Sequence, residues 1–446
     1  MQNCAAGEER ASILINRSFA VLWLGGAVST LGDVIFDTTI VLWIAARLAG
    51  GQTWAPLAVT GSLVAVAIPT ILIGPVAGVY ADRWDKRRTM LTMDAIRVLL
   101  ILALIPAAGV LPLPLEPHSV PVWWRLGSIY TIVVLATVCA QFFNPSRTVV
   151  VVDVVPSESQ ARAASLTLTT AALAGIIGPP LAAPLLFGLG VAWSLVFNAL
   201  SFALSFLAIL SLRLPDREEA VLAASPSSVF REFLAGLHFY RTNHLLRVLL
   251  ISAVLVSLGG GALVALDVFF TLFNLHAPAS WYGILGGFEG AGSLVGAVGA
   301  GFIAERLGAA RLFSLCLLAG GVLVLVYSRM TAFVPALLVI FLIGAAVAGV
   351  NVAVIPLIFQ TTPRDLLGRV MGVFTPAASL ATMVSMVLAG FLVGTVLHGL
   401  HANLVGIIFG PVDTVFAGTG LVILIGAVYA TSSLWAAETA PEPAGV

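Results

Sequence analysis

Residues 78–88 read Gly-Val-Tyr-Ala-Asp-Arg-Trp-Asp-Lys-Arg-Arg, a charged loop between the apolar runs 56–81 and 89–110. Residues 301–306 read Gly-Phe-Ile-Ala-Glu-Arg and close another apolar run, 281–304. A helix that crosses a bilayer needs about 20 mostly apolar residues, and each of these runs is long enough. The same motif at the end of an apolar run in both parts of the chain predicts an internal repeat.

Two offsets separate the matching positions of this repeat. Glu305 follows Asp82 by 223 residues. A second set recurs at an offset of 207 residues, with Asn144, Pro156 and Arg162 matching Asn351, Pro363 and Arg369. Loops of different length account for the difference between the offsets. Two repeats in this order are typical of a transporter whose binding site lies between its halves.

The composition indicates that the chain is solvated by a bilayer. It is 60% hydrophobic and only 9% charged, whereas an ordinary soluble domain is roughly a quarter charged. Its formal net charge is zero, which excludes a basic nucleic-acid-binding protein. We expect an all-α membrane protein with twelve transmembrane helices in two pseudo-symmetric six-helix bundles. The expected spans are 18–46, 56–81, 89–110, 124–147, 163–188, 190–212, 245–272, 281–304, 311–330, 333–359, 370–396 and 412–436.

The basic residues predict the orientation of these spans. An even number of spans places both termini on one side. With both termini inside, 18 of the 21 basic residues lie at the inner surface, Arg97 and Arg147 among them. The positive-inside rule makes that side cytoplasmic. We therefore expect a multi-pass protein of the cytoplasmic (inner) membrane with both termini in the cytoplasm, and no cleavable signal peptide.

Three parts are expected along the chain: an N-terminal six-helix bundle at 1–213, a cytoplasmic linker at 214–243 and a C-terminal six-helix bundle at 244–446. Within the linker, residues 229–240 predict an amphipathic helix whose apolar face carries Phe230, Phe233, Leu234, Leu237 and Tyr240. The sequence leaves open whether this face lies on the inner leaflet or packs on the bundle.

The loop at residues 78–88 resembles the loop 2–3 signature of the major facilitator superfamily. Asn16-Arg17-Ser18-Phe19, Leu22-Trp23 and Gly32-Asp33 are similar to the macrolide-efflux proteins and the enterobactin exporter, in the drug:proton antiporter branch. The resemblance implies the major facilitator fold and proton-coupled export. There are two departures. Asp85 stands where many members have Gly, and alanines flank the helix-5 motif Gly178-Pro179, at positions 174, 182 and 183.

The resemblance also implies gating roles for loops 2–3 and 8–9, at Gly78, Asp82, Arg83, Arg87, Arg88, Arg162, Glu305, Arg306 and Arg369. In this fold the second helix neighbours the eleventh, and the eighth neighbours the fifth. Helix N-termini attract acids, so we expect Asp82 to lie by Arg369 and Glu305 by Arg162. These contacts would hold an outward-open state. The alternative is that these charges only set the topology.

Acids inside the apolar runs are candidates for proton coupling, because a carboxylate in hydrocarbon is costly. Asp33 and Asp37 are four residues apart and share one helix face. Two carboxylates so close in a low dielectric repel each other, which favours a shared proton. Asp267 is the symmetry partner of Asp37, and Glu289 is expected to lie deepest in the membrane. The alternatives are a structural hydrogen bond for Asp33 and solvation at the outer surface for Asp37 and Asp267.

Other side chains are candidates for the wall of a substrate cavity. Polar residues inside the spans include Gln141, Asn144, Asn198 and Asn351, and each could equally form a hydrogen bond between helices. An aromatic wall for a bulky lipophilic substrate could come from Phe36, Trp43, Phe269, Phe270, Phe273 and Phe288. The alternative is that these rings pack within the protein or contact lipid.

The sequence thus favours a secondary transporter, and not an enzyme, that exports a lipophilic or amphiphilic small molecule such as a drug in exchange for protons. No Walker loop, metal spacing or nucleophile–base constellation stands out, so no cofactor or metal is expected. The expected partners are the substrate, protons and the lipid bilayer, without nucleic acid, and the expected state is a monomer. The alternatives are a dedicated exporter of one endogenous metabolite such as a siderophore or lipid, a substrate:proton symporter, and a membrane-embedded enzyme or receptor.

Overall fold

The computed structural model describes residues 15–110, 120–212, 237–363, 366–400, 402–404 and 407–439, and their side chains except those of residues 79, 81, 82, 402–404, 407, 408 and 435–439. Twelve helices in these ranges are long and apolar enough to cross a membrane, which confirms the predicted spans. The first six are α1 (Arg17–Trp43), α2 (Ala55–Arg83), α3 (Lys86–Ala107), α4 (Val122–Val154), α5 (Gln160–Pro184) and α6 (Val191–Ser211). The other six are α8 (His244–Phe273), α9 (Tyr282–Leu307), α10 (Ala309–Ser328), α11 (Phe333–Thr361), α12 (Leu367–Phe391) and α13 (Pro411–Thr439).

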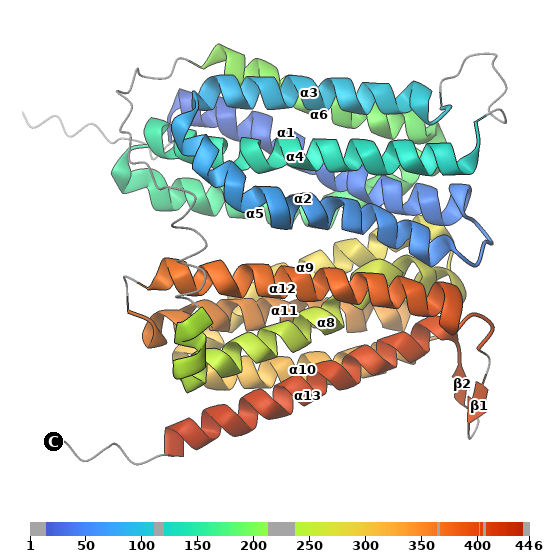
Figure 1. Ribbon diagram of the computed structural model, residues 1–446, viewed down its shortest axis with the longest axis vertical. Coiled ribbons are helices and arrows are strands. Elements are labelled where there is room, and N and C mark those ends of the chain that lie inside the picture. Colours follow the sequence, from blue (N-terminus) through green and yellow to red (C-terminus); the bar gives the residue numbers. More distant parts are fainter. Residues whose placement is uncertain are drawn as a thin grey trace, which may run out of the picture.

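The helices form two bundles with the same internal packing, seen one above the other in Figure 1. In the N-terminal bundle, α1 packs on α5 and α6, α3 packs on α4 and α6, and α2 packs on α4. The same pairs recur in the C-terminal bundle, where α8 packs on α12 and α13, α10 on α11 and α13, and α9 on α11. Between the bundles, α5 packs on α9 and α2 on α12, the neighbours that the sequence predicts.

Local signals in the sequence fix where helices begin. The carboxylate of Asp85 accepts a hydrogen bond from the Arg88 N–H at 2.8 Å and so caps the start of α3. This gives a structural role to the acid that replaces the glycine of many related sequences. The boundary between the fifth and sixth spans lies at Gly190, whose φ of 98° suits glycine and separates a π-helical turn, Leu185–Leu189, from α6.

Two arginines lie deeper than the sequence predicts. The fourth span was expected to end near residue 147, but α4 continues to Val154, so Arg147 lies two turns inside it. Arg97, also expected at the inner surface, lies in the middle of α3 and is only 3% exposed. Both positions correct the sequence prediction, because a basic residue in an apolar run was assigned to the nearest membrane surface.

The linker of residues 214–243 lies mostly outside the described residues. Its described end, residues 237–242, is helical. There Tyr240 is buried and its hydroxyl donates a hydrogen bond to the Val370 carbonyl at 3.2 Å. This end of the amphipathic segment therefore packs on the first turn of α12, as one of the two sequence-based alternatives has it.

We call the end of the bundle that carries Arg83, Arg88, Arg162, Arg306 and Arg369 the basic end, and the opposite end the far end. The far end holds a small hairpin of β1 (Ala402–Leu404) and β2 (Ile407–Phe409), in which Ala402 pairs with Phe409 and Leu404 with Ile407 (Figure 1). Beside this hairpin, a guanidinium nitrogen of Arg329 lies 2.8 Å from a carboxylate oxygen of the buried Asp413. The Cζ atom of the same guanidinium lies 4.7 Å from the centroid of the Phe409 ring. This ion pair joins the end of α10 to the start of α13.

Replacing Asp413 by Asn should lower the free energy of unfolding by about 2 kcal/mol, because the partly buried guanidinium of Arg329 loses its counter-charge. The measurement is thermal unfolding of the purified protein in detergent. Glu158→Gln, at an exposed acid, serves as the control and should leave the midpoint unchanged. Equal midpoints for both variants would show that the Arg329–Asp413 pair adds nothing to stability.

Candidate functional site

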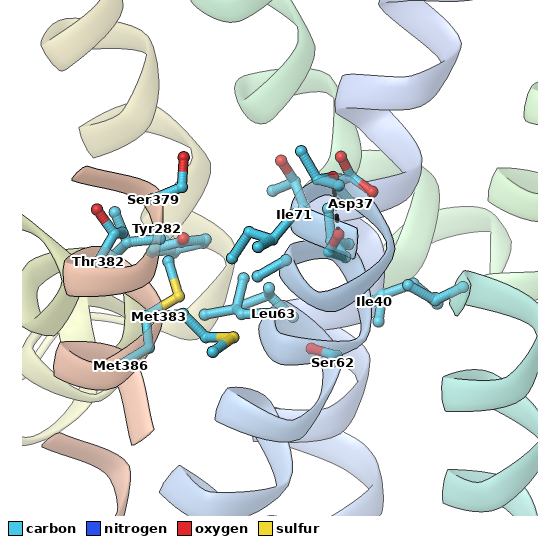
Figure 2. A pocket seen from close by; sticks show the side chains of 17 residues that line it. Asp37, Ile40, Ser62, Leu63, Ile71, Tyr282, Ser379, Thr382, Met383 and Met386 are labelled. Carbon is cyan, nitrogen blue, oxygen red and sulfur yellow. Dashed lines mark hydrogen bonds between the residues drawn. The ribbon is translucent and has the colours of Figure 1, made fainter. Parts of the chain in front are cut away.

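A cavity of about 410 Å³ lies between the two bundles. Its walls come from α1, α2 and α4 on one side and from α8, α9 and α12 on the other. Figure 2 shows Asp37, Leu63 and Ile71 facing Thr382, Met383 and Met386 across it. The cavity thus lies where two rocking halves of a transporter would hold a substrate.

The wall of this cavity is mostly aliphatic, with two methionines and Tyr282, and among the described residues Asp37 is the only charged side chain that lines it. Hydroxyl groups complete the wall. Four of these hydroxyls each donate a hydrogen bond to a backbone carbonyl of their own helix. The pairs are Thr38 to Val34, Ser62 to Val59, Thr70 to Val66 and Thr382 to Ala378. Their oxygens are left as hydrogen-bond acceptors. An apolar wall with acceptors and one carboxylate suits an apolar ligand that carries a positive charge or donor groups.

A second cavity, of about 210 Å³, extends from the first into the N-terminal bundle. The two share Asp37, Val66, Thr70 and Val133. The second is also lined by Asp33, Phe36, Arg97, Gln141, Asn198 and Phe202. The amide of Gln141 donates to the Thr70 hydroxyl at 3.3 Å, which crosses the shared wall. Asp37 therefore stands at the junction of the two cavities.

A cluster of charges from α1, α3 and α4 adjoins the second cavity. Arg97 lies 3.8 Å from Asp94, measured from Nη1 to Oδ1, and both side chains are buried. Electrostatic interactions join Asp33 to Arg97 and to Arg147, and Asp37, which is exposed to the cavities, interacts with Asp33. These three carboxylates and two guanidiniums carry one excess negative charge when all are ionised. One bound proton would therefore make the cluster neutral.

The two bundles touch closely at the far end. A Cβ added to Gly283 of α9 would collide with the Pro179 carbonyl of α5, and one added to Gly287 would lie 2.8 Å from the Ile176 carbonyl. On the other side, a Cβ on Gly390 of α12 would collide with the Thr60 hydroxyl of α2. At the basic end, a Cβ on Gly78, Gly299, Gly301, Gly368 or Gly372 would meet no atom of the described residues within 4 Å. Glycines thus allow backbone contact at the far end, while these positions at the basic end are uncrowded.

Comparison with known proteins agrees with this architecture. The family profile described as Major Facilitator Superfamily matches residues 22–385, most of the chain. The chain belongs to the major facilitator superfamily. It is a membrane transporter, and the resemblance seen in its loops and first helix is confirmed.

Two curated relatives of this superfamily member are efflux proteins. The multidrug efflux pump Tap of Mycobacterium tuberculosis (strain H37Rv) is 27% identical over 379 residues, which are 81% of this chain and 83% of Tap. Macrolide efflux protein A of Streptococcus pyogenes is 24% identical over 242 residues, 53% of this chain and 54% of that protein. Among solved structures, a bacterial homologue of the iron transporter ferroportin in its inward-facing state has a TM-score of 0.71 at 15% identity, covering 94% of this chain and 98% of that one. The last comparison establishes the fold alone.

The transporter's other intramembrane acids do not line either of the two described cavities. Asp267 accepts a hydrogen bond of 2.6 Å from the Tyr327 hydroxyl. Glu289, expected to lie deepest, has an exposed side chain on α9, although it interacts electrostatically with Asp267. Asn144 and Asn351 are exposed and also lie away from these cavities. Of the polar candidates, the structure brings together Asp33, Asp37, Gln141 and Asn198.

The expected aromatic wall is wrong for the first cavity. Trp43, Phe269 and Phe270 are buried in the hydrophobic core, and Phe273 and Phe288 are exposed away from the cavity. Phe36 alone of this set lines one of the two cavities, the second. Instead of phenylalanines, the first cavity has Met383, Met386 and Tyr282, which the sequence analysis did not single out. Methionine is flexible and polarizable, so this wall can adapt to ligands of different shape.

The predicted Glu305–Arg162 pair is not formed in this structure. Helices α5 and α9 pack together as predicted, but Arg162 and Glu305 are both exposed and, in the described part of the chain, form no ion pair with each other. Asp82 lies in the last turn of α2, and its side chain lies outside the described residues. Arg369 is exposed. Arg87 instead ties α3 to α6, donating to the Leu210 carbonyl at 2.7 Å.

At the helix-5 motif, small residues allow close packing. A Cβ on Gly178 would lie 2.6 Å from a methyl group of Val34 on α1, so the glycine is needed for α5 to approach α1. The flanking Ala174, Ala182 and Ala183 are buried, as small residues in a tight helix contact should be. Pro179 follows directly and contacts α9, so one short segment of α5 meets both bundles.

Proposed function

We propose that the chain exports amphiphilic small molecules, drugs among them, in exchange for protons by alternating access. The observation that carries this proposal is Asp37. In the described part of the chain it is the only charged side chain lining the cavity between the bundles, and it belongs to the charge cluster that one bound proton would make neutral. Either a proton or the positive group of a ligand can neutralise the excess charge. Binding of one therefore disfavours the other, which is the requirement for exchange.

The conformation fits the same proposal. We propose that the basic end faces the cytoplasm, because positive charges are retained inside, and that both termini lie there in the cytoplasmic membrane. The halves would then comprise residues 1–213 and 244–446, joined by the linker of residues 214–243, in a monomer. With the far end closed by glycine contacts and the basic-end glycines uncrowded, this structure corresponds to an inward-open state. The pairs Asp82–Arg369 and Glu305–Arg162 would form in the outward-open state.

The relatives support the direction of transport. Tap and macrolide efflux protein A are efflux proteins by their names, and the cavity of this chain has the apolar, acceptor-rich wall that an amphiphilic cation requires. Met383 and Met386 supply an adaptable surface, which suits a transporter with several substrates.

Efflux from intact cells tests the proposal. Cells that express the chain are loaded with erythromycin, tetracycline, chloramphenicol or ethidium, and retention is followed with and without a protonophore. We expect faster loss of at least one compound than in cells with the empty vector, and we expect the protonophore to remove the difference. If no compound leaves faster, or if the protonophore has no effect, proton-driven drug export is wrong for this chain. Alkalinisation of the medium on adding substrate would instead indicate a symporter.

A further inference from the structure

Arg97 occupies a position that a simple ion pair does not explain. Its guanidinium lies between the rings of Phe143 and Phe202, 4.6 and 4.9 Å from their centroids. Its nearest carboxylate, Asp94, is one turn earlier on the same helix at 3.8 Å, too far for a hydrogen bond. Nε and Nη2 of Arg97 are buried without a hydrogen-bond partner among the described residues. Asp94 is buried too, and the Ser205 side chain of α6 is its hydrogen-bonding neighbour. The guanidinium of Arg97 is therefore left unsatisfied by Asp94.

A second carboxylate can satisfy the guanidinium. Arg97 and Asp33 line the same cavity of about 210 Å³, so the space between α3 and α1 is open to side-chain movement. Asp33 and Asn198 of α6 line this cavity together, and the preceding Gly32 packs directly on Asn198 and Ser201. The two aromatic faces can hold the guanidinium without fixing its direction, because cation–π attraction does not specify a hydrogen-bond partner.

We propose that Arg97 is a positioning residue that exchanges between Asp33 and Asp94, and that protonation of the Asp33–Asp37 pair decides which carboxylate it binds. With Asp33 ionised, Arg97 bridges α3 to α1. When Asp33 takes a proton from the cavity, its charge is lost and Arg97 returns to Asp94 on its own helix. Proton uptake thereby releases α1 from α3. The consequence for transport rests on the proposed function, whereas the exchange itself does not.

The charged and titratable groups around Arg97 are consistent with this exchange. They are Asp33 and Asp37 on α1, Asp94 on α3, and Arg147 and the Cys139 thiol on α4, while α6 contributes the neutral Asn198. The guanidinium of Arg147 lies next to Gly26 of α1. Arg147 can therefore compensate whichever acid Arg97 leaves.

Infrared titration of the purified full-length protein in detergent tests the exchange directly. The absorbance of protonated carboxyl groups is followed against pH, and Asp33→Asn identifies the part of the signal that depends on Asp33. Asp94→Asn leaves Arg97 wholly to Asp33, so we expect the pH midpoint of that signal to fall by about one unit or more. Arg97→Gln removes the counter-ion, and the midpoint should rise by a similar amount. Arg97→Lys keeps the charge and should restore a midpoint close to that of the wild type.

The exchange predicts opposite shifts in Asp94→Asn and Arg97→Gln. It also predicts that Asp94→Asn has little effect once Arg97 is replaced by Gln, whereas direct repulsion between the two carboxylates would persist in that double variant. A shift in the same direction, none for Asp94→Asn, or an undiminished shift in the double variant overturns the exchange. If Arg97→Gln does not fold, Arg97→Met takes its place, alone and in the double variant. Because the titration uses no substrate, opposite shifts without drug efflux would reject the proposed function and keep the exchange. Proton-driven efflux without these shifts would reject the exchange and keep the proposed function.

Discussion

Asp37→Asn is expected to reduce efflux to the level of wild-type cells treated with a protonophore. Asn cannot take up or release a proton, so the variant loses the group that couples the cavity to the proton gradient. The shape of the cavity is kept, because Asn has nearly the size of Asp. The variant should therefore still bind substrate and exchange it down a concentration gradient. Efflux from energised cells and counterflow in proteoliposomes measure the two properties separately.

Asp267→Asn is the matched control for this prediction. Asp267 is the symmetry partner of Asp37 in α8, but it lines neither described cavity, and the Asn oxygen can still accept the hydrogen bond from Tyr327. We expect this variant to keep proton-driven efflux. If Asp267→Asn and not Asp37→Asn loses energised efflux, the coupling acid lies in the C-terminal bundle. Loss of counterflow in Asp37→Asn would mean that Asp37 serves binding only.

The second large effect is expected at the far end. Gly283→Ala places a methyl group against the Pro179 carbonyl, and because both positions are helix backbone, the helices α9 and α5 must separate. Overpacking of this kind costs about 1–3 kcal/mol. The cost applies only to the state with a closed far end, so the equilibrium should move toward an open far end by roughly ten- to a hundredfold.

Spin-label distances across the far end, between labels on α5 and α9, measure this shift in the purified protein. Gly299→Ala is the control, since it lies on the same helix and its Cβ would meet no atom within 4 Å. We expect longer far-end distances for Gly283→Ala and wild-type distances for Gly299→Ala. Identical distance distributions for the two variants would show that the glycine contact does not hold the far end closed.

The helices and their pairing could be predicted from the sequence because the signals are local or repeated. Apolar runs define the spans, the recurrence of Asp82 and Glu305 at equivalent positions predicts the repeat, and the family resemblance implies which helices meet across the two halves. The same reasoning misplaced Arg97 and Arg147, because a basic residue within an apolar run was assumed to reach the nearest surface. A buried guanidinium does not have to reach the surface when it lies against a carboxylate such as Asp94 or an aromatic face such as Phe143. These contacts become apparent only once the fold is known.

The candidate site could be predicted only in part. Asp33 and Asp37 stood out because acids are rare in spans, and both line cavities. Glu289 stood out for the same reason, yet it does not line either described cavity. Helices in a bilayer can be apolar on every face, so the hydrophobic pattern does not indicate which face meets a cavity. Residues such as Met383 therefore became recognisable only from the packing of α12.

The charges of the site and its adaptable surface belong to different halves of the chain. Asp33, Asp37, Asp94, Arg97 and Arg147 all come from the N-terminal bundle, whereas Tyr282, Met383 and Met386 come from the C-terminal one. A substitution that reshapes the methionine surface leaves the charged groups untouched. On the proposed function, single substitutions in the C-terminal repeat would change which compounds are recognised and would leave the charged groups proposed for energy coupling in the N-terminal repeat as they are.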